Sequence, residues 1–151
     1  MSRLPGEPLA VFSADCAAVG LASPEGIVAA VHAGWRGLLA GVGEATAAAM
    51  ASAGASEVFA VLGACIGPEC YEFGEADLEP LEARYGPTLA SKATSGALAL
   101  DLRAGVHRAL EAAGVAVASD EASCTACDLG YFSWRARRDL GRQALVVAGV
   151  P

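Results

Sequence analysis

The feature that most constrains the fold is an apolar run, Ile27 to His32 (IVAAVH), which leads into the small-residue segment AGWRG and then into a helical pattern. The run is rich in β-branched residues and does not alternate with polar ones, which is typical of a strand buried on both faces. From Leu38 to Ala53, small and apolar residues recur at helical spacing, and Gly54 follows as a C-terminal cap. The sequence therefore predicts a strand, turn and helix unit, with His32 at the end of the strand.

Short apolar segments and helical segments alternate along the rest of the chain. Further strands are predicted at 9–12, after the polar break at 13–15, at 58–67, at 131–134 and at 143–150, and helices up to about residue 86 and over 100–115, with a loop at 87–97. The alternation favours a three- or four-layer α/β or α+β fold, and strands at both ends of the chain indicate a mixed sheet. A length of 151 residues predicts a single domain, residues 1–151.

The charge of the chain argues against polyanionic partners. Lys and Arg number 10 against 17 Asp and Glu, the net charge is -7, and the basic residues form no run. Phosphate backbones and anionic lipids attract basic surfaces, so nucleic acid and membranes are not the expected partners and small molecules are. No apolar run reaches the roughly 18 residues of a membrane-spanning helix, and the first residues lack a secretory signal, so a cytoplasmic location is predicted.

The cysteines do not indicate a disulfide framework, because their number is odd and no export signal precedes them. Cys16 follows a polar break after the first strand, and His32 ends a later strand. A thiolate and an imidazole are preferred zinc ligands, and the same pair occurs as nucleophile and base in cysteine hydrolases. A third interpretation is a small buried apolar side chain at Cys16.

Arg36 lies four residues after His32 in a turn that also contains Trp35. Such a turn before a helix directs backbone N–H groups at an anion, and an arginine adds a bidentate contact to phosphate or carboxylate. The alternative is a surface salt bridge of Arg36 with Trp35 in the core.

The remaining cysteines suggest a second metal site. CIGPEC and CTAC together offer a four-cysteine zinc site, although Cys65 ends an apolar strand and is expected to point inward; the four residues are Cys65, Cys70, Cys124 and Cys127. A redox role for CTAC has less support, because no thioredoxin-like helix follows it. The segment RARRD, 135–139, is interpreted as a solvated turn, with Arg135 able to enter a pocket beside Ser133. Glycine patterns of the Walker or Rossmann type and a GxSxG motif are absent from the sequence.

An ordered set of motifs resembles one known family. ADC, VAAVHAGWRGLLAGV, GACIGPECYEFG, LDLRAGV, CT, FSWRARRD and GRQA follow one another as in the YfiH or laccase-domain family, over residues 9–147. Members of that family are described as multicopper polyphenol oxidases, as purine nucleoside phosphorylases with adenosine deaminase activity, and as peptidoglycan editing factors. Their fold is similar to the catalytic domain of cytotoxic necrotizing factor. The resemblance therefore implies an α+β fold of mixed β-sheets flanked by helices.

The resemblance also implies a zinc site built from a His, a Cys and a second His. Cys16 and His32 match the second and third ligands, whereas the first belongs to a Gln-Val-His motif upstream of ADC in the family, and this chain begins almost at the strand before ADC. Either the sequence is part of a longer protein or it is a short form with an incomplete site. By motif position, Arg36 is expected to be catalytic by binding phosphate, and the expected substrate-binding residues are Asp15, Trp35, Cys65, Gly67, Tyr71, Ser133 and Arg135.

The implied function is a metal-dependent purine nucleoside phosphorylase that uses zinc, or alternatively copper, with adenosine deamination as a second activity. Purine nucleoside and phosphate are the expected partners. Copper-dependent phenol oxidation is an alternative, but two histidines are few for a multicopper cluster. A cysteine hydrolase, a peptidoglycan editing factor and a non-catalytic binding module are further alternatives. Exposed sheet edges would favour a homo-oligomer.

Overall fold

The structure is a computed structural model that describes residues 1–150, so the predicted domain limit at residue 151 lies outside the described residues. Its strands are β1 (Pro8–Ser13), β2 (Ala17–Ala22), β3 (Val28–Ala33), β4 (Phe59–Leu62), β5 (Ala90–Lys92), β6 (Leu98–Leu100), β7 (Ala116–Asp120) and β8 (Gln143–Ala148). Its α-helices are α1 (Trp35–Leu39), α2 (Val42–Ser52), α3 (Glu75–Tyr85), α4 (Leu102–Ala112) and α5 (Trp134–Arg137), with 3-10 turns at Pro68–Cys70 and Pro87–Leu89.

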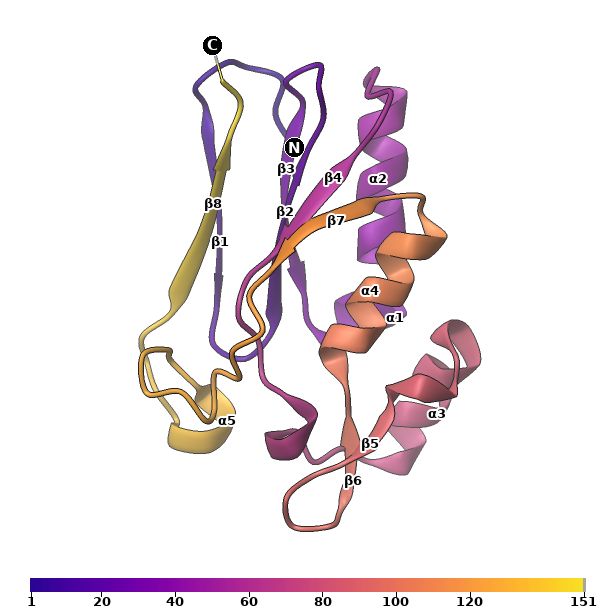
Figure 1. Cartoon of the computed structure of the whole chain (residues 1–151), viewed down its shortest axis with the longest axis vertical. Helices are drawn as coiled ribbons and strands as arrows, with labels where there is room; N and C mark the ends of the chain where they lie inside the picture. The colour runs from indigo at the N-terminus through magenta and orange to yellow at the C-terminus, as the bar shows by residue number, and fades with distance from the viewer. Residues whose placement is uncertain (151) are drawn as a thin grey trace.

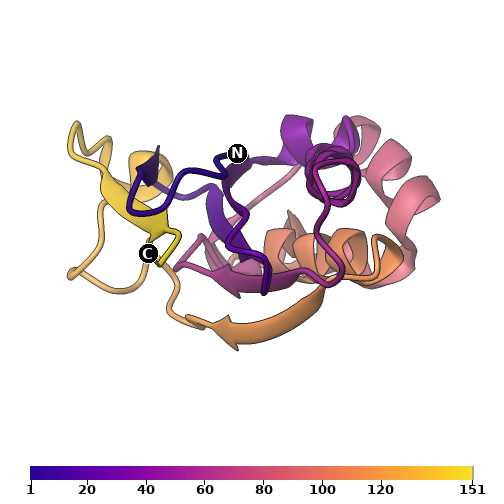
Figure 2. The same ribbon diagram turned by 90° about the horizontal axis from the view of Figure 1, so that it is seen from above.

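A central sheet separates helices α1, α2 and α4 from a two-stranded sheet (Figure 1). The central sheet has the order β3-β2-β4-β7, in which β2 is antiparallel to β3 and β4, and β4 is parallel to β7. Helices α1, α2 and α4 cover one face, and the antiparallel pair β1-β8 covers the other (Figure 2). The prediction of an α+β fold with mixed sheets flanked by helices is confirmed.

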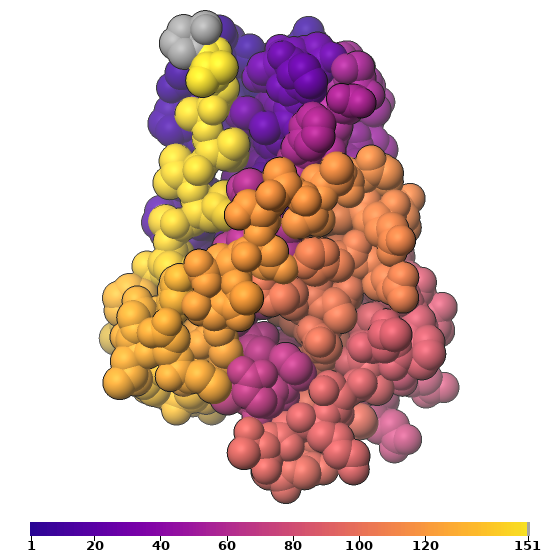
Figure 3. All heavy atoms as spheres, viewed as in Figure 1, coloured from indigo at the N-terminus to yellow at the C-terminus, as the bar shows by residue number. Residues whose placement is uncertain are grey.

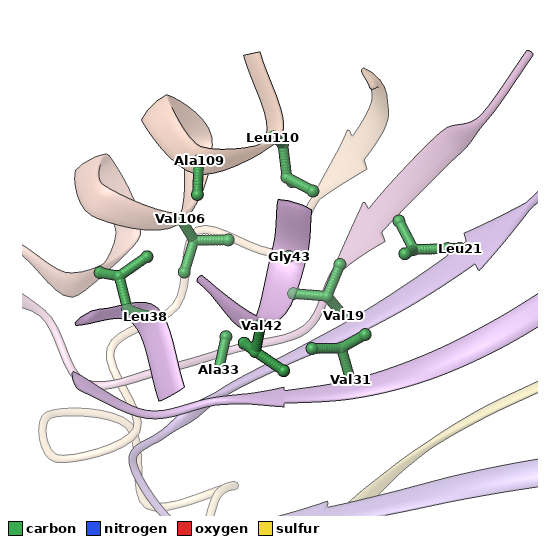
Figure 4. A pocket seen from close by; sticks show the side chains of 10 residues that line it. All are labelled: Val19, Leu21, Val31, Ala33, Leu38, Val42, Gly43, Val106, Ala109 and Leu110. Carbon is green, nitrogen blue, oxygen red and sulfur yellow. The ribbon is translucent and has the colours of Figure 1, made fainter. Parts of the chain in front are cut away.

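The main core fills the space between the central sheet and the helices. Val19, Leu21 and Val31 of the sheet face Val106 and Leu110 of α4 (Figure 4). Their side chains leave a gap of about 10 Å³, which holds little more than one water-sized sphere and is lined by apolar groups. This gap is therefore an imperfection of core packing and has no room for a substrate.

Two local predictions at the helices are wrong. The helix predicted over 38–53 is two helices, because Gly41 adopts a left-handed conformation with φ of 77° and ends the helical path between α1 and α2. As a result, Trp35 and Arg36 lie in the first turn of α1 and not in a loop.

The segment 131–134 is not a strand. Ser133 accepts a hydrogen bond from the Ala136 amide at 3.1 Å and so caps α5, which begins at Trp134. Of the arginines that follow, Arg135 and Arg138 are exposed, but the Arg137 guanidinium donates to the carbonyl of Ala126 at 2.9 Å. The short helix therefore closes the loop that carries the CTAC motif.

Three strands escaped the sequence analysis. Strand β7 pairs with β4 at the edge of the central sheet, and β5 and β6 form a small antiparallel sheet where a loop was predicted. Most residues of β7 are exposed, so the strand lacks the apolar run that marks a buried one. The two strands of the small sheet have only three residues each, which is too short for a periodic pattern.

The outer face of the β1-β8 sheet is apolar. Side chains alternate along both strands, and every residue that points away from the central sheet is exposed and apolar; these residues are Pro8, Ala10, Phe12, Ala144, Val146 and Ala148. Phe12 is 61% exposed and Val146 is 60% exposed. Among residues 1–150, no helix has both the length and the apolar character needed to cross a bilayer.

Candidate functional site

Cys16 and His32 converge on Gly34. Cys16 lies in the bend between β1 and β2, and His32 lies in the neighbouring strand β3. A β-carbon added to Gly34 would lie 2.8 Å from Cys16 Sγ and 3.8 Å from His32 Nε2. The two side chains therefore approach the same point, and the approach is possible because residue 34 has no side chain.

The hydrogen bonding of His32 leaves one ring nitrogen free. Nδ1 lies 3.1 Å from the carbonyl oxygen of Phe12, a bond in which the ring nitrogen is the donor. This fixes the tautomer and leaves the Nε2 lone pair available to a metal or a proton. Burial raises the pKa of the Cys16 thiol, and the neighbouring Asp15 carboxylate raises it further. A nucleophilic cysteine needs the opposite shift, so the direction of this pKa shift does not favour a cysteine hydrolase.

Asp15 connects the segments around Cys16. Its backbone has a positive φ of 99°, and its buried carboxylate accepts a hydrogen bond from Thr125 Oγ1 at 2.8 Å and one from the Arg135 amide at 2.6 Å. Its carbonyl oxygen accepts from the Ile66 amide at 2.9 Å. Because both carboxylate oxygens bind within the protein, Asp15 holds the site together and does not face a substrate.

Aromatic rings and arginines form one wall beside Cys16. Phe73 packs edge to face between Trp35 and Tyr71, with ring centroids 5.4 Å and 5.5 Å away. The Arg36 guanidinium lies 4.3 Å from the centroid of Trp35, and that of Arg135 lies 4.7 Å from the centroid of Tyr71. The wall therefore presents both stacking surface and positive charge.

In this wall the phenol of Tyr71 is neutral and the guanidinium of Arg36 has no ion-pair partner among residues 1–150. Burial raises the pKa of Tyr71 to about 12, and the proximity of Cys16 contributes to the rise. Arg36 is exposed and, within residues 1–150, has no carboxylate partner and no hydrogen bond from its side chain. An exposed, unpaired guanidinium is suited to binding an anion such as phosphate.

Besides Asp15, three of the predicted substrate-binding residues are engaged in other contacts within the protein. Cys65 is 1% exposed and belongs to the core, where burial raises the pKa of its thiol to about 12. The Ser133 hydroxyl is occupied as the cap of α5. The Gly67 amide donates to Cys124 Sγ at 3.1 Å and so faces the cysteine cluster. Motif position does not reveal these contacts, and a substrate-binding role of these residues stays a prediction.

The predicted four-cysteine site is wrong in one ligand. Cys70, Cys124 and Cys127 come together, but the fourth member is Glu69 and not Cys65. Cys65 takes part only through its backbone, which forms a parallel bridge with Cys124. Glu69 lies within the CIGPEC motif, and nothing in the sequence pattern indicated its participation.

Two residues of the site were missed by the sequence analysis. Thr125 binds Asp15 across 110 positions of sequence, and Phe73 connects the rings of Trp35 and Tyr71. The only available signals were the polar residue inside CTAC and the aromatic residue inside YEFG. Neither signal specifies a partner.

A family model described as multi-copper polyphenol oxidoreductase laccase matches residues 1–149. The chain belongs to this laccase family. The laccase-family chain is 40% identical over 142 residues to a Streptomyces coelicolor protein named purine nucleoside phosphorylase, an alignment that covers 92% of this chain and 58% of that protein. It is 32% identical over 144 residues to a protein of an unknown prokaryotic organism named adenosine deaminase, covering 89% of this chain and 55% of the relative.

Solved structures share the fold of the laccase-family chain. Protein NMB0706 of Neisseria meningitidis has a TM-score of 0.83 at 30% identity, with 95% of this chain and 61% of that one covered. The YfiH protein of Bacillus licheniformis has a TM-score of 0.86 at 24% identity, with 99% and 60% covered. The chain therefore spans less than two thirds of the length of these relatives.

The donor chemistry at Gly34 suits zinc, but the number of donors is incomplete. In the laccase-family chain, Cys16 offers sulfur and His32 offers Nε2, which are two ligand types that zinc prefers. Catalytic zinc normally has three protein ligands, and within residues 1–150 no third Cys, His, Asp or Glu joins this pair. The pair thus supplies two of the three protein ligands that a catalytic zinc ion normally has.

Proposed function

We propose that this chain carries the catalytic residues of a metal-dependent purine nucleoside phosphorylase. The observation that supports this most is the convergence of Cys16 and His32 at Gly34, two residues before Arg36, whose guanidinium has no ion-pair partner within residues 1–150. The names of relatives, among them the Streptomyces coelicolor protein, support the same reaction. The proposal assigns the ligand roles to Cys16 and His32. A third ligand would then come from a source other than residues 1–150 of the same copy, such as a second copy of the chain.

The residues have distinct tasks in this reaction. Arg36 binds inorganic phosphate and orients one oxygen toward the ribose C1′ atom. The half-buried ring of Trp35 offers a surface against which a purine can pack, and the buried ring of Tyr71 supports it through Phe73. When zinc is bound, it supplies Lewis-acid stabilisation of negative charge.

The chemistry balances without a further reactant. A phosphate oxygen forms a bond to C1′ while the bond from C1′ to the purine nitrogen breaks, and the electron pair leaves with the purine. The purine then takes a proton, and the products are ribose 1-phosphate and the free base. The positive charge of Arg36 keeps phosphate in place while negative charge moves onto the purine.

The test is phosphorolysis of inosine by the zinc-supplemented chain, with ribose 1-phosphate as the measured product. Cys16→Ala and His32→Ala are each expected to lower the rate by at least about 100-fold. Arg36→Ala is expected to raise the KM for phosphate by roughly 10-fold or more, because a bidentate charged contact is worth about 1.5–3 kcal/mol. Arg108→Ala is the matched control, since Arg108 pairs only with Glu111 on the surface. Absence of ribose 1-phosphate from zinc-loaded protein would rule the proposal out.

Adenosine deamination is the second candidate, supported by the relative named adenosine deaminase. It requires water to attack C6 of the purine and release ammonia, so ammonia release from adenosine in the same variants tests it. Copper-dependent phenol oxidation has less support, because the chain contains two histidines and a multicopper cluster needs many. Binding of several copper ions per chain would revive it. Purine binding without turnover would favour a non-catalytic module.

A further inference from the structure

A second group of ligating side chains lies on the other side of the CIGPEC loop. One ligand atom from each of Glu69, Cys70, Cys124 and Cys127 lies within 4.8 Å of all the others. The Cys70 and Cys127 sulfurs are 3.3 Å apart, and Cys127 Sγ lies 3.6 Å from a Glu69 carboxylate oxygen. In Figure 3 the turn around residues 68–70 lies against the segment that carries Cys124 and Cys127. Two segments more than fifty residues apart thus bring their ligand atoms to one point.

Backbone groups hold the two segments that carry these ligands together. Cys65 and Cys124 form a parallel backbone bridge, and the Thr125 amide donates to the Cys65 carbonyl at 3.2 Å. The Gly67 amide donates to Cys124 Sγ at 3.1 Å and so orients this sulfur. A β-carbon on Gly67 would overlap the Glu69 carboxylate, so glycine is what allows that carboxylate to fold back toward the sulfurs.

We propose that Glu69, Cys70, Cys124 and Cys127 bind a zinc ion at a structural site separate from the Cys16 and His32 pair. Zinc takes four ligands in a tetrahedron with sulfur at about 2.3 Å, which places neighbouring sulfurs about 3.8 Å apart. The two sulfurs that are 3.3 Å apart lie somewhat closer than that value, and all four ligand atoms lie within 4.8 Å of one another, so small side-chain movements suffice. On binding, each thiol transfers its proton to solvent and its sulfur lone pair to the ion.

This site would connect two walls of the candidate active site. Cys70 directly precedes Tyr71 in the aromatic wall, and Thr125 lies between the ligands Cys124 and Cys127 and donates to Asp15. Four protein ligands leave no open position for water, so the ion has no catalytic step of its own. Its role is to fix the CIGPEC loop against the CTAC loop.

The experiment is a cobalt and zinc titration of metal-free, reduced protein. Cobalt in a thiolate-rich tetrahedral site gives intense sulfur-to-cobalt charge-transfer absorption, and one equivalent of zinc should displace it. The absorption is expected in the wild-type chain and equally in the double variant Cys16→Ala/His32→Ala, which is the matched control. Cys127→Ser and Cys124→Ser should each weaken zinc binding by at least about 100-fold. Mutation of a residue that only hydrogen-bonds to a ligand weakens metal binding less, by about 10-fold to 100-fold.

Two further measurements keep the result interpretable. X-ray absorption of the zinc-loaded wild-type chain should find three sulfurs and one oxygen around the ion, and it does not depend on any variant folding. Zinc should also slow hydrogen exchange at the amides of Gly67 and Thr125, and Glu69→Gln should reduce this protection. Cobalt absorption that disappears in Cys16→Ala/His32→Ala would overturn the proposal. A Cys70–Cys127 disulfide that persists after treatment with a reductant would also overturn it. So would fewer than three sulfurs around the ion.

Discussion

At the scale of single residues, Asp15 has the largest number of connections at the candidate site. Its buried carboxylate joins the CTAC loop through Thr125 and helix α5 through Arg135, and its carbonyl joins the end of the segment after β4. Buried polar groups that lose a partner cost free energy, because they no longer bind water either. The residue is therefore important for stability as well as for the geometry around Cys16.

Replacing Asp15 by alanine should lower the free energy of unfolding by about 1–3 kcal/mol, because the Arg135 amide and the Thr125 hydroxyl lose their acceptor. Asp15→Asn is expected to retain most of the stability. The amide oxygen can accept from Arg135, and the amide nitrogen can donate to the Thr125 hydroxyl, which then turns its own proton away. Urea unfolding of both variants measures the difference. Equal losses in the two variants would show that the carboxylate is not the connection described.

The buried thiol and phenol predict a loss of stability in alkali. The pKa of Cys65 rises from 9.0 to about 12, and that of Tyr71 from 10.0 to about 12, in both cases mainly through burial. The folded protein therefore binds more protons than the unfolded chain between pH 9 and pH 12, and stability falls as the pH rises through this range. Below pH 9 the contribution is fully present.

Urea unfolding at a series of pH values tests this dependence. Tyr71→Phe removes one of the groups, so its stability should decline less steeply than that of the wild type above pH 10. Tyr85→Phe is a parallel case, because burial also raises the pKa of Tyr85 to about 12. A wild-type profile that is flat over this range would contradict the assignment.

The sequence motifs indicated which residues to consider, but they did not indicate where each side chain points. Cys16 and His32 were chosen from their motifs, and the structure brings them together at Gly34, while their roles stay predictions. Cys65 and Ser133 were chosen from the same motifs, but one enters the core and the other caps a helix. Which way a loop side chain points depends on contacts with distant segments, and a single sequence does not contain those contacts.

At the scale of elements, helix α2 offers a simple change. Gly43 lies within the helix, beside the small apolar gap, and an added β-carbon would lie 3.8 Å from the Ala109 β-carbon, an ordinary contact. Gly43→Ala is expected to raise the free energy of unfolding by about 0.5–1 kcal/mol, because alanine favours the helix and fills part of the gap. Thermal unfolding should show a rise in Tm of a few degrees.

Gly41→Ala is the matched control for this prediction. Residue 41 has a φ of 77°, and a β-carbon there would also press on the Arg84 guanidinium. The same chemical change should therefore lower Tm at position 41 and raise it at position 43. A loss of stability at both positions would mean that the gap beside α2 is tighter than described.

The elements that the sequence predicted best are those with strong apolar patterns. Strands β2 and β3 and helix α4 were found because they contribute buried side chains to the core. The division between α1 and α2 was missed, because the glycine responsible occurs among many small residues with the same composition. Strand β7 was missed because an exposed edge strand has little need of apolar residues.

At the scale of the whole molecule, the apolar outer face of the β1-β8 sheet predicts self-association. Monomeric proteins rarely expose contiguous apolar patches of this kind. Sedimentation velocity should show association that increases with concentration, and Val146→Lys should reduce it because Val146 is central in that face. Glu111→Lys adds the same residue on a distant helix and should leave association unchanged. A strictly monomeric wild-type chain would contradict this prediction.

The pairing of β1 with β8 also orders events during synthesis. Strand β1 binds residues 143–148, so its partner is synthesised long after it. Asp15 and Cys16 directly follow that first strand, and Asp15 also waits for Thr125 and Arg135. Contacts between segments far apart in sequence form late, because a long loop has to close. The nascent chain can thus assemble its helices and central sheet early, while Cys16 acquires its surroundings only after the segments around Thr125, Arg135 and β8 have been synthesised.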